Sequence, residues 1–167
     1  MIQEHLDLWN KIQAFPLDDP GSSLCFSDRL ARENGWDLKF TLRAIEEYKR
    51  FMFLICIAQH PLTPSDQVDQ VWHLHLIYTR SYWEEFCGQT LGRQVHHGPT
   101  KGGKAEGEKF QDWCAKTQEL YAVTFGHAPP ADLWPSGQER FSDIDFIRVN
   151  KRKNWIITKP KYLWQRH

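Results

Sequence analysis

The sequence predicts a mainly α-helical fold, a compact bundle of about four or five helices with a long glycine-rich loop. Three observations support this fold class. Apolar residues recur at helical spacing through most of the chain. Ser, Asp, Gly and Pro residues stand where those segments would begin and end. Strand-like runs are confined to the C-terminal end.

Three helices are predicted in the first part of the chain. In residues 5–15, apolar side chains at positions 6, 8, 9, 12 and 15 follow a helical period, and the stretch "PLDDPGSS" ends the segment. Ser27 is the predicted N-cap of a second, short helix that ends at Gly35. Asp37 is the predicted N-cap of a third helix, which runs to about Gln59 and stops before two prolines.

Two further helices follow, on either side of a glycine-rich loop. Ser65 begins the fourth predicted helix, which runs without interruption to about Phe86. The stretch 87–109 then holds six of the ten glycines of the chain, and long loops in compact domains are often functional. A fifth helix is predicted over about residues 105–125, and Gly126 follows it as the C-cap.

The C-terminal end differs from the rest in charge and in pattern. After Asp145 the chain has seven Lys and Arg residues and no Asp or Glu, so residues 1–147 carry an acidic excess. The runs "FIRV" and "WIIT" predict a small β-hairpin. We therefore expect a helical domain, 1–142, and a basic extension, 143–167, that packs on this domain or binds a protein partner. Binding of single-stranded nucleic acid by the same cations and aromatic rings is the less favoured alternative.

Composition and segment patterns exclude several classes of protein. The most apolar run, "FMFLICIA", is far shorter than the roughly 20 residues of a membrane-spanning helix, so we expect no membrane association. The first residues, "MIQEHLDLWNKIQ", lack the apolar segment of a signal peptide. The four cysteines are widely spaced, which favours free thiols in a reducing compartment. A cytoplasmic protein is therefore the expectation.

Five stretches of the chain together resemble a known family. They are "FSDRLARENGW", "AIEEYKRFMFL", "TPSDQVDQVWHLHLIYTRSYWEEFC", "HHGPT" and "YAVTFGHAPPADLWP", and they span roughly residues 25–142. The chain resembles the glycine-rich domain-containing protein-like family, a bacterial group similar to the N-terminal domain of plant glycine-rich domain proteins. The resemblance implies no particular reaction, because the family has no settled biochemical function.

The histidines of "VDQVWHLHL" are the candidates for chemistry. Positions four apart on a helix share a face and positions two apart do not, so Asp69 pairs with His73 whereas His75 points elsewhere. A metal ion needs three or four ligands. His97 of "HHGPT" is the predicted third ligand, and this nitrogen and oxygen set suits a divalent metal such as zinc, iron or manganese. The alternates are His75, His96, Cys87 and Glu47.

Other interpretations of the same residues stay open. The histidines also fit a structural hydrogen-bond network or a metal-free site for a small molecule. The alternative function is a metal-free protein-interaction module that uses the aromatic and basic surfaces, and the sequence does not decide whether the protein is an enzyme. A weaker signal is an anion-binding turn, where backbone N–H groups before the fifth helix would attract a phosphate or carboxylate. Its residues are Lys101, Gly102, Gly103 and Lys104.

Overall fold

The structure, a computed structural model, describes residues 2–98, 104–136, 149–150 and 152–157. Its elements in chain order are η1 (Ile2–His5), α1 (Leu6–Ala14), α2 (Phe26–Asn34), α3 (Leu38–Ile57), α4 (Asp66–Ile77), η2 (Ser81–Leu91) and α5 (Lys104–Phe125). Element η1 is a 3₁₀-helix, η2 is a π-helix and the others are α-helices. No strand occurs in these ranges, so the predicted mainly α-helical class is confirmed. None of the helices described is long and apolar enough to cross a membrane.

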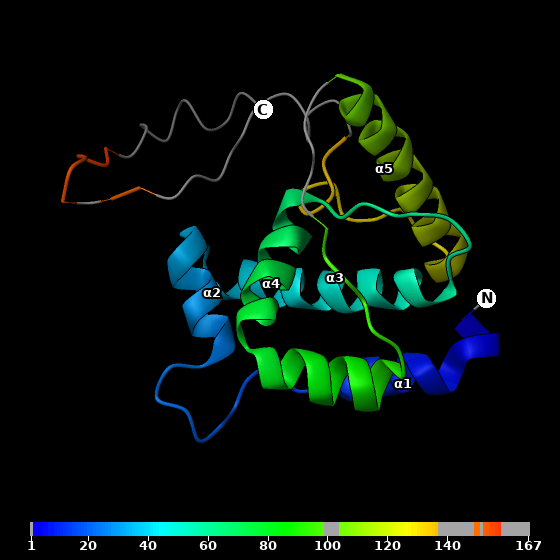
Figure 1. The fold of residues 1–167 in the computed structure, drawn as a ribbon, viewed down its shortest axis with the longest axis horizontal. Coiled ribbons are helices and arrows are strands. Elements are labelled where there is room, and N and C mark those ends of the chain that lie inside the picture. Colours follow the sequence, from blue (N-terminus) through cyan, green and yellow to red (C-terminus); the bar gives the residue numbers. More distant parts are fainter. Residues whose placement is uncertain (1, 99–103, 137–148, 151, 158–167) are drawn as a thin grey trace.

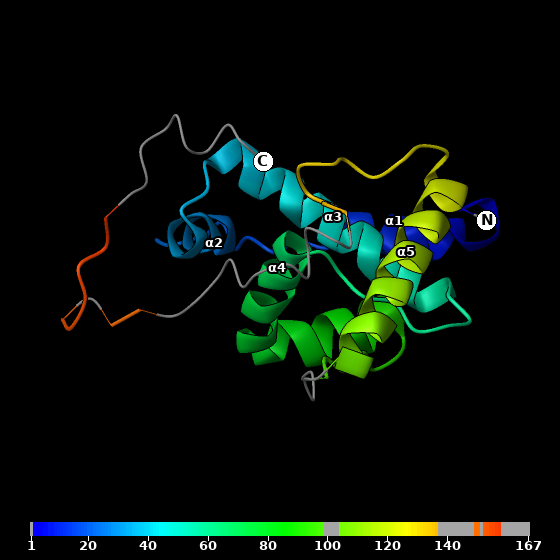
Figure 2. The ribbon, with the colours of Figure 1, turned by 90° about the horizontal axis from the view of Figure 1, so that it is seen from above.

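Helix α3 is the central element of the fold. It contacts α1, α2, α4 and α5, and α1 also contacts η2. Figure 1 shows α3 running across the molecule, with α1 and η2 on one side and α5 on the other. The turned view in Figure 2 shows α5 crossing the C-terminal half of α3. The rings of Tyr48, Phe51 and Phe53 on α3 are fully buried, so this helix supplies the aromatic centre of the core.

Two of the predicted helix starts are confirmed in detail. The carboxylate of Asp37 accepts a hydrogen bond of 2.8 Å from the Phe40 N–H at the start of α3. The hydroxyl of Ser65 accepts one of 3.2 Å from the Val68 N–H at the start of α4. Each side chain satisfies a backbone donor that has no partner inside its helix. Gly35 follows α2 with φ of 69°, the left-handed conformation predicted for a C-cap glycine.

The predicted start of the second helix is wrong by two residues. Cys25 is the N-cap of α2, and its side chain makes no capping hydrogen bond. Ser27 lies inside the first turn, where its N–H and hydroxyl donate to the two carboxylate oxygens of Asp18 at 2.7 and 2.8 Å. The acceptor for this helix end therefore comes from nine residues upstream, and a search for a local cap residue cannot find it.

The predicted uninterrupted fourth helix is also wrong, because the chain breaks into two helices. Helix α4 ends at Ile77, and Tyr78 takes the non-helical conformation φ −81°, ψ 64°. The chain then resumes as η2, which extends past the predicted end at Phe86 to Leu91. The glycine-rich loop is correspondingly shorter than the sequence predicts.

The buried residues of η2 follow the period of a π-helix. They are Tyr82, Phe86, Cys87 and Leu91, at offsets of four, five and nine from the first. Hydrogen bonds from i to i+5 place residues with these offsets on one face. In an α-helix, with about 100° per residue, a residue nine positions on would lie on the opposite face. The π-helix therefore keeps both Tyr82 and Leu91 in the core.

The predicted C-terminal hairpin and domain boundary fall largely outside the described residues. Of the run "FIRV" only Val149 is described, and the boundary at residues 142 and 143 lies in an undescribed range. Trp155, Ile156 and Ile157 of the second run are described and have no regular secondary structure. The hairpin and the division into two parts therefore remain predictions.

Candidate metal centre

Asp69 and His73 lie on one face of α4, one helical turn apart. The Nδ1 atom of His73 is 3.9 Å from Oδ2 of Asp69. Residues four apart on an α-helix are neighbours on its surface, so this pair follows from the local helical geometry alone. The Asp69 side chain is 16% exposed and that of His73 is 50% exposed. Asp69 is thus largely covered by its surroundings, whereas half of the His73 side chain faces solvent.

His97 reaches the same place from the segment after η2. Its Nε2 atom is 2.7 Å from Oδ1 of Asp69, although the two residues are 28 positions apart. The ring centres of His97 and His73 are 4.5 Å apart. One ligand atom from each of the three side chains lies within 4.8 Å of the others. The three residues named from the sequence therefore converge in space.

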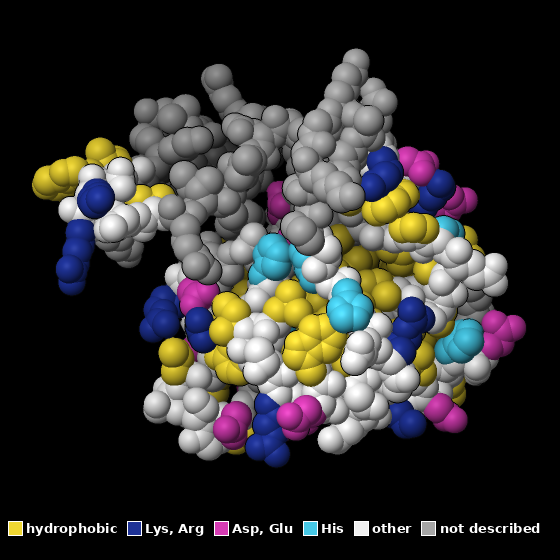
Figure 3. All heavy atoms as spheres, viewed as in Figure 1, with side chains coloured by type: hydrophobic (Ala, Val, Ile, Leu, Met, Phe, Trp, Pro, Cys, Tyr) yellow, Lys and Arg dark blue, Asp and Glu magenta, His cyan; other side chains and the backbone are white. Residues whose placement is uncertain are grey.

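Among the described residues, the surroundings leave the centre open on one side. The ring of Trp72 packs edge-on against His97, with 4.4 Å between ring centres, and only 5% of Trp72 is exposed. His97 is 19% exposed, so His73 is the most accessible of the three side chains. Figure 3 shows histidine side chains at the surface over α4, beside apolar side chains.

The spacing of the donor atoms suits a small ion after modest adjustment. Zinc binds histidine nitrogen and carboxylate oxygen at about 2.0–2.2 Å, which places two ligands of a tetrahedral ion about 3.4 Å apart. The contact of 2.7 Å between Asp69 and His97 would have to widen, and His73 would have to approach Asp69. Rotation of the half-exposed His73 side chain would provide that approach. Without an ion, the short contact is a hydrogen bond in which the imidazole N–H donates to the carboxylate.

The alternate His75 lies in the core, away from this centre. It is fully buried, with its Nδ1 atom 2.8 Å from the Tyr48 hydroxyl and its Nε2 atom 3.2 Å from the Ser81 hydroxyl. Burial lowers the pKa of His75 from 6.5 to about 3, so the ring is neutral at ordinary pH. Both ring nitrogens have hydrogen-bonding partners, which fits a structural role for this histidine.

Two other alternates lie near η2 but outside the cluster of three. His96 is exposed, and its ring centre is 5.3 Å from that of Trp83. Cys87 is a buried free thiol on the core face of η2. Burial raises the pKa of Cys87, which disfavours the thiolate form that metals bind.

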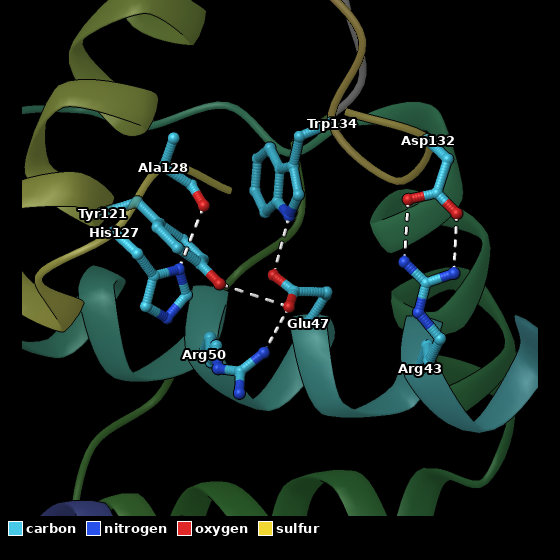
Figure 4. A network of polar contacts seen from close by, with 8 residues as sticks. All are labelled: Arg43, Glu47, Arg50, Tyr121, His127, Ala128, Asp132 and Trp134. Atoms are coloured by element: carbon cyan, nitrogen blue, oxygen red, sulfur yellow. Dashed lines mark hydrogen bonds and ion pairs between the residues drawn. The ribbon is translucent and has the colours of Figure 1, made fainter. Parts of the chain in front are cut away.

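The last alternate, Glu47, belongs to a separate network on α3. Its buried carboxylate accepts hydrogen bonds from the Arg50 guanidinium, from the Tyr121 hydroxyl at 3.2 Å and from the Trp134 indole N–H at 2.9 Å. Figure 4 shows these donors converging on Glu47 from α3, from α5 and from the segment after α5. Three donors to one buried carboxylate form a structural junction, because its oxygens already have partners.

The predicted anion-binding turn falls mostly outside the described residues. Lys101, Gly102 and Gly103 lie in an undescribed range, and Lys104 is the first residue of α5. Anion binding at this turn remains a prediction from the sequence.

Sequence reasoning did not assign a role near the site to Tyr82. The hydroxyl of this buried residue lies between Trp72 on α4 and the backbone of Val95, two residues before His97. The signal in the sequence was the spacing of Phe86, Cys87 and Leu91 at four, five and nine positions after Tyr82, because a π-helix puts these residues on one buried face. The contact with Val95 itself depends on tertiary packing.

The described helices form a small helical body in which the mostly buried Asp69 and His97 meet the half-exposed His73. The chain belongs to the UCP032817-like family, whose model matches residues 29–123, more than half of the chain. The matched range contains Asp69, His73 and His97.

Two plant proteins are also similar to this chain. Over 92 residues it is 27% identical to glycine-rich domain-containing protein 1 of Arabidopsis thaliana. This aligned region covers 52% of this chain and 11% of the plant protein. Over 109 residues it is 24% identical to glycine-rich domain-containing protein 2 of the same plant, covering 59% of this chain and 12% of the relative. The resemblance to the glycine-rich domain-containing group is thereby confirmed. The matches span only 11% and 12% of the lengths of these curated relatives, and no solved structure matches the chain.

Proposed function

We propose that this protein binds one divalent transition-metal ion through Asp69, His73 and His97. The observation that carries the proposal is the convergence of three ligand atoms within 4.8 Å from two segments far apart in the sequence. Local helical geometry accounts for Asp69 and His73, but it does not require a second imidazole to arrive from a loop. Two imidazoles and one carboxylate form a donor set of the kind found in protein metal sites.

The donor set favours zinc, iron or manganese. Imidazole nitrogen suits zinc and iron, and carboxylate oxygen suits manganese as well. Three protein ligands leave at least one coordination position for water or for a small molecule. The ion would act as a Lewis acid toward an oxygen atom of the molecule that fills this position. The half-exposed His73 lies on the side from which that molecule would enter.

Metal affinity of tag-free protein tests this proposal. We expect the wild-type chain to bind one Zn²⁺ or Co²⁺ ion per molecule in competition with a chromophoric chelator. His97→Ala removes a ligand, so its affinity should fall by more than about 100-fold, beyond the loss typical of residues that only support a ligand. His96→Ala is the matched control, because this neighbouring imidazole is exposed and lies outside the cluster. Equal affinities of the two variants, with both folded by circular dichroism, would contradict the proposal.

A second candidate function is a metal-free protein-interaction module. The observation in its favour is an exposed apolar run beside cations: Trp155 is 95% exposed and Ile157 is 87% exposed, and Arg152 and Lys153 precede them. Large exposed apolar side chains in a cluster mark interaction sites. A wild-type chain that binds no metal in the competition assay would make this second function the better supported one.

A further inference from the structure

Tyr82 is a fully buried residue of η2 whose hydroxyl uses both of its hydrogen-bonding capacities. The hydroxyl donates to the backbone carbonyl of Val95 at 2.5 Å. It accepts a hydrogen bond of 2.9 Å from the indole N–H of Trp72. Neither Trp72 nor Val95 is more than 5% exposed, so water does not readily replace these contacts.

These two hydrogen bonds join the two segments that supply the candidate ligands. Trp72 lies on α4 next to His73 and three residues after Asp69. Val95 precedes His97 by two residues, a reach of about 7 Å in an extended chain. The Tyr82 hydroxyl thus fixes the backbone of Val95 relative to α4. His97, which contacts Asp69, follows two residues later.

The surroundings of Tyr82 make it a rigid support. Its ring lies 5.1 Å from that of His75 and 4.8 Å from that of Trp83, measured between ring centres. The π-helical register holds its face of η2 against the core, together with Phe86 and Leu91. The hydroxyl therefore has little freedom to follow the loop if the loop moves.

We infer that Tyr82 is a positioning residue for the metal centre: through Val95 it holds the backbone that carries His97 beside Asp69, where a small widening of their contact would admit an ion. This inference rests on the proposed metal-binding function. Tyr82 does not contact the ion in this arrangement. It acts on the centre by fixing the backbone that carries a ligand, and partners of this kind tune metal affinity.

Substitution Tyr82→Phe tests the inference, because it removes only the hydroxyl. We expect the affinity for Zn²⁺ or Co²⁺ to fall about tenfold, the lower end of the range for residues that orient ligands. Tyr121→Phe is the matched control. Tyr121 is equally buried, and its hydroxyl donates to Glu47, so the control also loses a buried hydroxyl but has no link to His97. The two variants should lose similar stability, and only Tyr82→Phe should lose metal affinity.

A second readout needs no metal. Amide hydrogen exchange of residues 95–98 reports how firmly the segment is held in chelator-treated protein. We expect faster exchange there in Tyr82→Phe and unchanged exchange in Tyr121→Phe. If Tyr82→Phe does not fold, Trp72→Phe takes its place, because it removes the indole N–H that donates to the Tyr82 hydroxyl and leaves a smaller aromatic ring beside His97. Its expected loss of affinity is severalfold.

The outcomes separate the inference from the proposed function. If wild-type protein binds no metal, the proposed function fails, and the exchange of residues 95–98 alone decides whether Tyr82 holds the segment. If wild-type protein binds metal but Tyr82→Phe and Tyr121→Phe bind it equally, the positioning role is wrong and the metal site stands. A selective loss in Tyr82→Phe supports both.

Discussion

Two histidines that are two positions apart on α4 have opposite surroundings. The His73 side chain is 50% exposed and lies next to Asp69, whereas His75 is fully buried. A rotation of about 200° between them accounts for the difference. The aromatic rings around His75 include Phe15, Phe26 and Tyr82, at ring-centre distances of 5.1–6.0 Å. A charged imidazole in this apolar environment would be strongly disfavoured.

The buried His75 should make the fold sensitive to acid. Its pKa is 6.5 in the unfolded chain and about 3 in the fold, so between these values the unfolded state binds more protons. The contribution of the neutral His75 to the free energy of unfolding is fully present above pH 6.5 and is lost as the pH falls toward 3. With about 1.4 kcal/mol per pKa unit, the expected loss between pH 7 and pH 4 is roughly 3 kcal/mol.

Urea unfolding at pH 7, 5 and 4, in the presence of chelator, measures this effect. His75→Gln cannot take up the proton, so it should lose less stability than the wild-type chain over the same interval, although it is the less stable protein at pH 7. Parallel stability curves for the two proteins would show that His75 is not the acid-sensitive group.

At the scale of single elements, η2 depends on the glycine that ends it. Gly92 follows the π-helix with φ of 67°, and a Cβ at this position would meet no atom within 4 Å. The cost of Gly92→Ala is therefore conformational, about 1 kcal/mol for a non-glycine residue in the left-handed region. Gly98→Ala is the control, because it also meets no atom within 4 Å and its φ is not positive.

Chelator-treated variants unfolded in urea report the two free energies of unfolding. Gly92→Ala should be destabilised, while Gly98→Ala should be unchanged or slightly stabilised by a less flexible unfolded chain. A loss of stability in Gly98→Ala as large as that in Gly92→Ala would refute the conformational explanation.

The elements differ in how far the sequence predicts them, according to where their determinants lie. Asp37 and Ser65 accept hydrogen bonds from backbone N–H groups three residues further on, so these helix starts can be predicted from the local sequence. The start of α2 depends on Asp18, which is remote from it in sequence. The break at Tyr78 has no Gly or Pro to mark it, and the π period of η2 emerges only when Leu91 is counted with Tyr82.

The candidate site divides in the same way. The pairing of Asp69 with His73 is a property of one α-helix and is predicted from spacing. The arrival of His97 depends on how η2 packs against α4, and the sequence could only suggest it from residue type. The alternates could not be excluded from sequence for the same reason, because the positions of His96, Cys87 and Glu47 are set by tertiary contacts.

At the scale of the whole molecule, the buried carboxylate of Glu47 joins parts of the chain that are far apart. Its donors belong to α3, to α5 and to the segment after α5, with Tyr121 and Trp134 lying 74 and 87 positions away in sequence (Figure 4). Nearby, the guanidinium of Arg43 on α3 forms a bidentate ion pair with the carboxylate of Asp132, at 2.6 and 2.7 Å. These polar contacts fix the C-terminal part of the helical body on α3.

Substitution Glu47→Gln should destabilise the whole fold. It removes the charge that Arg50 pairs with and sets an amide N–H₂ group against donors, so we expect a loss of about 2–3 kcal/mol. Glu46→Gln is the control, because that side chain is 48% exposed and its ion pair with Lys49 spans 3.7 Å. Its effect should stay within about 0.5 kcal/mol. Thermal unfolding followed by circular dichroism distinguishes them, and equal midpoints would mean that Glu47 is not a structural junction.

The contact between Asp69 and His97 joins two residues that flank the entire π-helix η2 in the sequence. An ion held by both side chains would bind only those conformations in which these two residues lie together. By mass action it would stabilise them by about 2.7 kcal/mol at a concentration 100 times Kd. The ion and the π-helix would then open as one cooperative unit, and local unfolding of η2 would become a function of metal concentration.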